Sequence, residues 1–213
     1  FEADECGALN DFLAAAPDAE PVCSGIAAMT SITDFAAREP RALADNEELS
    51  LGAKTIRWLD TPHLPHGWDS GLIFETTTRT LFCGDLFTQG GSGKVALTER
   101  DILGPSEAFR KPMDYYSHSP QTGAMLERLA ALSPTTLACM HGSAWRGDGA
   151  ALLRAALPDR GVAMRRWLHQ PAGPIRALTF LSYAPGVVTR RTIATRSRVR
   201  LPRAGADGRP TRP

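Results

Sequence analysis

The sequence predicts a protein of the α/β class, in which strands and helices alternate along residues 1–157. Two observations carry this prediction. Short apolar runs bounded by Gly or Pro alternate with stretches whose apolar residues recur at helical spacing. Acidic residues and histidines also follow several of the predicted strands directly, and open α/β sheets place their ligand sites at such strand ends.

The first elements are expected before residue 60. A loop is predicted to run into a helix within residues 1–16, because apolar residues recur there and Pro17 ends the run. A short strand near residues 20–23 and a helix over residues 26–38 follow. Residues 47–59 are typical of two strands joined by a turn at Leu51-Gly52.

The second half of the domain contains clearer signals. Residues 72–74 and 80–83 flank a polar run and predict a β-hairpin. Residues 122–132 predict an amphipathic helix, because four apolar residues at helical spacing share one face. A strand over residues 135–140 and a helix over residues 149–157 complete the predicted domain.

The chain divides by composition into an acidic body and a basic tail. Residues 158–213 contain seven prolines, 12 arginines and two acidic residues, a net charge of +10, whereas residues 1–157 carry a net charge of −9. The tail is predicted to be poorly ordered, because it shows no sustained apolar period. The acidic body favours cation binding and makes nucleic-acid binding unlikely, since that requires a basic face.

Location and redox state are also constrained by the sequence. No apolar run approaches the length that crosses a bilayer, and no basic start precedes an apolar stretch, so we expect a cytoplasmic protein without a membrane partner. None of the four cysteines pairs at CxxC spacing. They are therefore interpreted as single buried thiols rather than as disulfides or metal ligands.

Four short stretches place an acidic residue or a histidine beside Gly or Pro. Taken singly, each has an ordinary explanation, such as a turn former, a helix cap or a hydrogen-bonded loop histidine. Taken together, they supply the nitrogen and oxygen ligands of a two-metal site, which also needs an anionic group between the two cations. The candidate ligands are Glu2, Asp4, Glu5, His66, Asp85 and His141.

The order of these motifs resembles that of the metallo-β-lactamase superfamily, in which H-x-[HE]-x-D is followed by His, then Asp, then His. Glu2-Ala3-Asp4 matches the end of the first motif, whose leading histidine would stand before Phe1. The later motifs match P-H-G-W-D-S, G-D-L-F and M-H-G. The resemblance implies a four-layer αββα sandwich, here lacking its first strands, with residues 1–157 as the C-terminal part of the domain.

Glu2 stands where the hydrolases of this superfamily usually carry a second histidine, and this resembles the flavodiiron and oxygen-binding di-iron proteins. The resemblance implies that Glu2 and His66 hold one metal, that Asp4 and His141 hold the other, and that Asp85 bridges them. It implies two metal ions, with iron favoured over zinc, and O₂ or NO as the ligand. Because no flavodoxin-like domain follows, the electron donor is expected to be a separate protein.

Two alternatives remain open at this stage. The first is a zinc-dependent hydrolase of a small-molecule ester, thioester or phosphodiester, in which Asp4 and Asp85 are the catalytic residues and Asp4 orients the nucleophile. The second is a truncated relative that keeps the fold without catalysis. The residue at position 5 matters for both alternatives. Many members of the superfamily have a further histidine ligand where this chain has Glu5.

Overall fold

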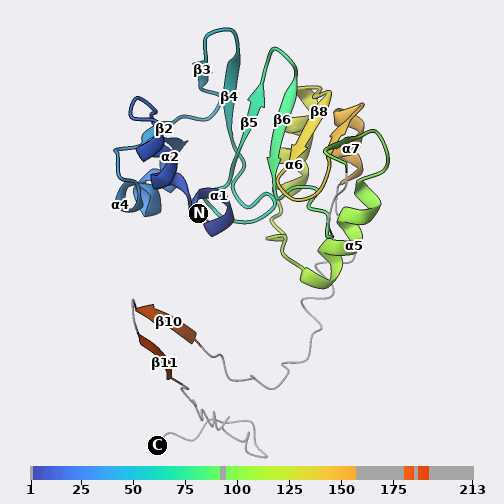
Figure 1. Cartoon of the computed structure of the whole chain (residues 1–213). Helices are drawn as coiled ribbons and strands as arrows, with labels where there is room; N and C mark the ends of the chain where they lie inside the picture. Colours follow the sequence, from blue (N-terminus) through green and yellow to red (C-terminus); the bar gives the residue numbers. More distant parts are fainter. Residues whose placement is uncertain (1, 92–94, 157–179, 185–186, 192–213) are drawn as a thin grey trace, which may run out of the picture. The chain divides into compact units, whose positions relative to one another are not determined.

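The computed structural model describes residues 2–91, 95–156, 180–184 and 187–191 (Figure 1). The chain separates into two compact units, Phe1–Arg165 and Arg166–Pro213. In the second unit, β10 (Phe180–Ala184) and β11 (Val187–Arg191) pair as an antiparallel hairpin. The rest of the predicted basic tail lies outside the described residues. None of the described helices is long and apolar enough to cross a membrane.

The first unit alternates helices and strands, as the sequence predicts. Its helical segments are α1 (Ala3–Cys6), α2 (Leu9–Ala15), α3 (Gly25–Ala27), the π-helix η1 (Ala28–Ile32), α4 (Thr33–Phe35), α5 (Leu103–Met113), α6 (Thr122–Ala131) and α7 (Gly149–Ala155). Its strands are β1 (Val22–Ser24), β2 (Arg41–Leu43), β3 (Glu48–Ser50), β4 (Thr55–Asp60), β5 (Gly71–Glu75), β6 (Thr80–Gly84), β7 (Leu97–Thr98), β8 (Thr136–Cys139) and β9 (Ala144–Arg146).

A seven-stranded mixed sheet with the order β3-β4-β5-β6-β8-β9-β7 forms the centre of the first unit. The predicted hairpin over residues 72–83 is present as the antiparallel pair β5 and β6. Strands β6 and β8 are parallel neighbours, and β4 runs in the same direction because two antiparallel pairings separate it from β6. The C-terminal ends of β4, β6 and β8 therefore meet at one edge of the sheet.

The core lies between one face of the sheet and helices α6 and α7, which Figure 1 shows behind the strands. Leu81 and Leu137 are register partners on β6 and β8, and both are fully buried. Leu126 and Leu129 of α6 are also fully buried, which fits the amphipathic pattern predicted for this helix. This packing fixes the ends of β6 and β8 relative to one another.

The opposite face of the sheet also carries apolar side chains. Strand register aligns Trp58 with Ile73, Ile73 with Phe82, and Phe82 with Ala138, so the four residues form a row across β4, β5, β6 and β8. Trp58 is buried, but Phe82 is 48% exposed. Within the described residues there is thus one large sheet with a core on one face and a partly uncovered apolar row on the other.

Helix α5 was not predicted from the sequence. Its first turn contains Gly104 and Pro105, which are poor helix formers, but proline is tolerated in a first turn because no backbone donor is needed there. The carboxylate of Asp101 caps this end by accepting hydrogen bonds from the backbone N–H of Leu103 and Gly104, at 2.9 and 3.1 Å. The hydrogen bonds to Asp101 thus stabilise the start of a helix whose first turn has low helix propensity.

Other differences concern boundaries and very short strands. The helix predicted over residues 26–38 spans Gly25 to Phe35 and contains a π-helical turn at Ala28–Ile32. It ends because Ala36 adopts an extended conformation. Strands β2, β7 and β9 have only two or three residues, too few for a periodic pattern to indicate them.

Candidate metal centre

The segments that carry the predicted ligands converge at the sheet edge where β4, β6 and β8 end. The loop after β4 carries His66, the turn after β6 carries Asp85, and the residues after β8 carry His141. Glu2, directly before α1, and Asp4, within α1, reach the same place, and Figure 1 shows α1 below the lower ends of β4 and β5. Residues from four distant parts of the sequence therefore meet.

Asp85 occupies the centre of this cluster. Its Oδ2 atom lies 3.1 Å from Nε2 of His66, and its Oδ1 atom lies 3.3 Å from Nε2 of His141. Each carboxylate oxygen thus faces a different histidine. The Asp85 side chain is only 15% exposed, so its charge is held in a partly desolvated place where a cation would be favoured.

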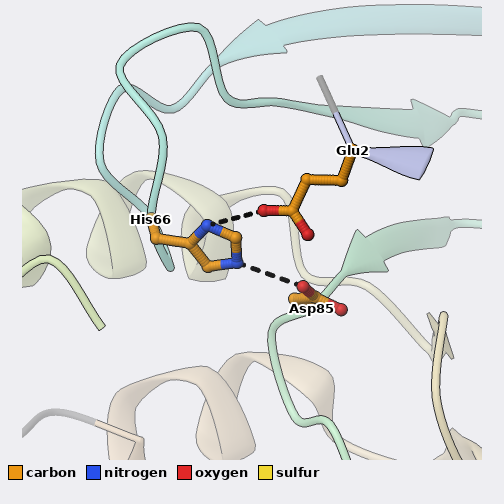
Figure 2. Close-up of side chains that lie close together, drawn as sticks. All are labelled: Glu2, His66 and Asp85. Atoms are coloured by element: carbon orange, nitrogen blue, oxygen red, sulfur yellow. Dashed lines mark hydrogen bonds and ion pairs between the residues drawn. The ribbon is translucent and has the colours of Figure 1, made fainter. Parts of the chain in front are cut away.

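The two N-terminal carboxylates lie on opposite sides of Asp85. Glu2 Oε1 is 3.3 Å from Nδ1 of His66, and Figure 2 shows the His66 ring between Glu2 and Asp85. Asp4 Oδ2 is 3.1 Å from Nε2 of His141. Each histidine therefore has one N-terminal carboxylate and one oxygen of Asp85 as neighbours, which gives two half-sites that share a single aspartate.

The loop that presents His66 is anchored by Leu64, whose side chain is fully buried. The Ser70 hydroxyl donates a hydrogen bond of 2.8 Å to the Leu64 carbonyl, and the Thr61 N–H donates one of 2.9 Å to the Ser70 carbonyl. Gly67 has a φ of 75°, a conformation that glycine adopts without strain. Buried and hydrogen-bonded neighbours thus fix the loop on both sides of His66.

The turn that presents Asp85 is held in the same way. Leu86 and Phe87, which follow it, are almost completely buried. The Thr88 hydroxyl donates to the Asp85 carbonyl at 2.8 Å, and the Tyr115 hydroxyl donates to the same carbonyl at 3.1 Å. These contacts leave both carboxylate oxygens of Asp85 directed at the histidines. No sequence pattern indicated this role of Thr88.

Gln89 positions the segment around His141, a role that no sequence pattern indicated. Its backbone N–H donates to the His141 carbonyl at 3.0 Å. Its side-chain amide donates to the Ser143 carbonyl at 3.1 Å and accepts from the Ser143 N–H at 3.3 Å. Gly142 packs so closely on Gln89 that an added Cβ would lie 2.7 Å from the Gln89 Cβ. Gln89 therefore acts as a clamp beside His141.

Glu5 lies near the cluster but less directly than the other candidates. Its Oε1 atom is 3.9 Å from the position that a Cβ on Gly84 would take. Burial raises the pKa of Glu5, and the carboxylates of Asp85, Glu2 and Asp4 raise it further. Among the described residues, the ion pairs of the two histidines are formed with the other three carboxylates and not with Glu5.

The donor set fits a metal of the iron, zinc or manganese kind. Imidazole nitrogens and carboxylate oxygens suit these cations, and thiolates are not required. Within the described part of the chain, Glu2, His66 and Asp85 form the group of three whose ligand atoms all lie within 4.8 Å of one another. The half-site of Asp4 and His141 is more open. Among the described residues, Asp4 does not belong to a second group of three whose ligand atoms lie this close together.

A cavity of about 770 Å³ opens over the cluster. Its lining includes Glu2, His66, Asp85 and His141 of the cluster, together with Tyr115. The other lining residues are Thr88, Gln89, Gly91, Phe109, Met113, Met140 and Gly142.

Comparison with known proteins gives structural matches only. No protein-family model and no curated protein sequence matches the chain. The rubredoxin:oxygen oxidoreductase of Desulfovibrio gigas superposes with a TM-score of 0.59 and 21% identity, covering 71% of this chain and 39% of that one. The flavodiiron protein of Giardia intestinalis matches with a TM-score of 0.58 and 22% identity, covering 69% and 37%.

A structure described as a peroxy di-iron species of the chemotaxis sensor ODP matches with a TM-score of 0.63 and 15% identity, covering 79% of this chain and 72% of that one. The fold is that of the metallo-β-lactamase-like domain of the flavodiiron proteins. The α/β fold class expected from the sequence is thereby confirmed. The chain spans less than two-fifths of the length of the two flavodiiron proteins, so their activities are not transferred to it by fold alone.

Proposed function

We propose that this chain holds a di-iron centre that binds or reduces O₂ or NO. The observation that carries the proposal is the position of Asp85, whose two carboxylate oxygens face two different histidines at 3.1 and 3.3 Å. A shared anionic group of this kind offsets the repulsion between two adjacent cations. The fold shared with the flavodiiron proteins supports the same choice.

The ligands divide into two sets in this proposal. Glu2 and His66 would hold one iron, Asp4 and His141 would hold the other, and Asp85 would bridge them. Glu5 would be a further ligand or a nearby charge, placed beside Gly84. When bound, the irons would supply open positions for the diatomic ligand and the electrons for its reduction, which an electron donor would replenish.

The remaining side chains of the site keep the ligands in place. The hydroxyls of Thr88 and Tyr115 hold the backbone of Asp85, and the amide of Gln89 holds the strand that follows His141. Second partners of this kind restrict ligand orientation and strengthen metal binding. The apolar side chains of Phe109, Met113 and Met140 also line the cavity.

A zinc-dependent hydrolase is a second candidate, and the size of the cavity favours it. A volume of about 770 Å³ falls within the range of ~300–1,000 Å³ that is typical of pockets for organic ligands, and a diatomic gas needs far less. In that case Asp4 would orient a metal-bound water for attack on an ester, thioester or phosphodiester. The third possibility, a relative without catalysis, predicts that the site binds no pair of metals.

The full-length chain should be loaded separately with Fe²⁺ under anaerobic conditions and with Zn²⁺, and the bound metal should be measured by mass spectrometry. The di-iron proposal expects two irons per chain, and a change in visible absorption when O₂ or NO is admitted. Retention of zinc with metal-dependent ester hydrolysis would support the hydrolase instead. If the chain binds neither metal, the third possibility, a relative that keeps the fold without catalysis, would be supported.

His63→Asn is a matched control for His66→Asn in this experiment. His63 lies three residues earlier in the same loop, is exposed, and has a φ of 66°, which asparagine tolerates better than most residues. His66→Asn is expected to lose one iron per chain and the response to O₂. His63→Asn is expected to keep both, and equal losses in the two variants would contradict the proposed ligand set.

A further inference from the structure

Cys83 and Cys139 lie opposite one another on adjacent strands, directly below the metal centre. Strands β6 and β8 are parallel, with Phe82 paired to Ala138 and Gly84 paired to Cys139. The register therefore shifts between Phe82 and Gly84. This irregularity is a β-bulge, in which two residues of one strand oppose one residue of its partner, so Cys83 and Gly84 both face Cys139.

Both cysteine side chains are on the core face of the sheet. They follow Leu81 and Leu137 by two residues, and side chains two apart in a strand share a face. Cys83 is fully buried in the core, and Cys139 is partly buried and packs against that core. Each thiol donates a hydrogen bond to the carbonyl two residues earlier in its own strand, Cys83 to Leu81 at 3.4 Å and Cys139 to Leu137 at 3.9 Å.

The backbone geometry suits a disulfide between these residues. Neighbouring strands lie about 4.8 Å apart, and disulfides join residues whose Cα atoms are roughly 4.4–6.8 Å apart. All four cysteines are free thiols in this structure. The sequence interpretation as single buried thiols does not account for two of them meeting on adjacent strands.

We propose that Cys83 and Cys139 form a redox-active pair, which hydrogen peroxide oxidises to a disulfide and a dithiol reductant reopens. The sulfur of Cys139, the less buried of the two, attacks the peroxide O–O bond, which gives a sulfenic acid and one water. The sulfur of Cys83 then attacks the Cys139 sulfur, and the hydroxyl leaves as a second water. Two thiols lose two electrons and two protons, and one peroxide is reduced.

The pair is placed where its oxidation would reach the metal centre. Cys83 precedes Asp85 by two residues, and Cys139 precedes His141 by two residues. A disulfide there would link the ends of β6 and β8 covalently, just before the two residues Asp85 and His141 that face one another at 3.3 Å. The thiol chemistry itself does not depend on the proposed function.

The other two cysteines set the design of the experiment. Cys6 packs against a smaller core cluster that contains Cys23, so both thiols are removed to exclude other pairings. The full-length chain with Cys6→Ala and Cys23→Ala retains only the pair in question. It is reduced, exposed to graded hydrogen peroxide, quenched with catalase, alkylated, digested and analysed by mass spectrometry.

The proposal expects a cross-linked peptide pair containing Cys83 and Cys139, a loss of both free thiols, and full recovery with dithiothreitol. Recovery of both residues as alkylated thiols after peroxide treatment would overturn it. Oxidation of Cys139 to the sulfinic or sulfonic acid, with Cys83 still alkylatable, would overturn it as well, because a resolving thiol in place should prevent this.

Single variants make the assignment independent of the cross-linked peptide. With Cys139→Ala in the same background, Cys83 should stay alkylatable after peroxide treatment, because its partner is gone. With Cys83→Ala, Cys139 should be over-oxidised at peroxide concentrations that leave the pair as a disulfide. Circular dichroism checks that each variant is folded. Peroxide-dependent loss of Cys83 alkylation in the Cys139→Ala variant would contradict the proposal.

Discussion

The Oδ2 atom of Asp85 lies 3.1 Å from the Nε2 atom of His66, although the two residues belong to different loops. The same carboxylate reaches His141 through its other oxygen. A neutral side chain at this position would keep the shape and remove the charge that the proposed pair of cations requires. The following predictions concern this arrangement and the fold that supports it.

Asp85→Asn should abolish the paired binding of metal. We expect the variant to bind at most one metal per chain, because an amide cannot offset the repulsion between two cations. Metal analysis after equilibrium dialysis measures this. Asp18→Asn, a change at an exposed residue between α2 and β1, is the control and should keep the wild-type stoichiometry. Two metals bound to Asp85→Asn would rule out the bridging role.

Gln89→Ala should weaken the half-site of His141 while leaving the fold intact. Losing a partner that orients a metal ligand lowers affinity by about 10–100-fold. The measurement is a competition titration with a chromophoric chelator. Gln121→Ala, at the exposed N-terminus of α6, provides the comparison and should bind metal as the wild type does. An unchanged affinity in Gln89→Ala would show that the clamp does not position His141.

Leu64→Ala should destabilise the chain and loosen the His66 loop. Removing a fully buried leucine side chain costs about 2–5 kcal/mol of unfolding free energy. Leu51→Ala, at a side chain that is 58% exposed, should change stability by less than about 0.5 kcal/mol. Urea denaturation of both variants measures the difference. Similar midpoints for the two would mean that Leu64 does not anchor the loop.

Glu75 should contribute a pH-dependent part of stability. The hydroxyl and backbone N–H of Thr78, with the N–H of Thr77, lower the pKa of Glu75 from 4.5 to about 2. A lowered pKa in the folded state stabilises the protein above pH 4.5, and this contribution is lost as the pH falls towards 2. Urea midpoints at pH 6 and pH 3 should therefore differ less in Glu75→Gln than in the wild type.

Glu99→Gln serves as the control for Glu75→Gln, because Glu99 is exposed. When the pH is lowered from 6 to 3, the urea midpoint of Glu99→Gln should decrease by the same amount as that of the wild type. If Glu75→Gln also follows the wild type, the Thr77 and Thr78 contacts do not hold the carboxylate in its charged form.

Phe82→Ser should reduce self-association of the chain. Phe82 is 48% exposed in the middle of an apolar row across the sheet, and such surfaces promote association. Light scattering as a function of protein concentration measures this effect. Phe12→Ser, at another highly exposed aromatic residue but on helix α2, is the comparison and should have the smaller effect. Equal effects would mean that the row has no special role.

The sequence by itself determined the local elements and the kinds of ligand. The hairpin over residues 72–83 follows from two apolar runs on either side of a polar run, and the helix over residues 122–132 follows from periodicity, which reports the buried face of a single element. His66, Asp85 and His141 could be named because each follows a predicted strand beside Gly or Pro. The order of the motifs also led to the resemblance whose fold the structural matches confirm.

Only the tertiary structure decided which side chains meet. The parallel pairing of β6 and β8 brings Asp85 beside His141, and it also brings Cys83 beside Cys139. The side chains of Gln89 and Thr88 donate hydrogen bonds to backbone carbonyls of the site, and no sequence pattern encodes these contacts. Strand pairing and long-range hydrogen bonds join residues distant in the chain, so their geometry is set by packing of the whole sheet and not by local propensity.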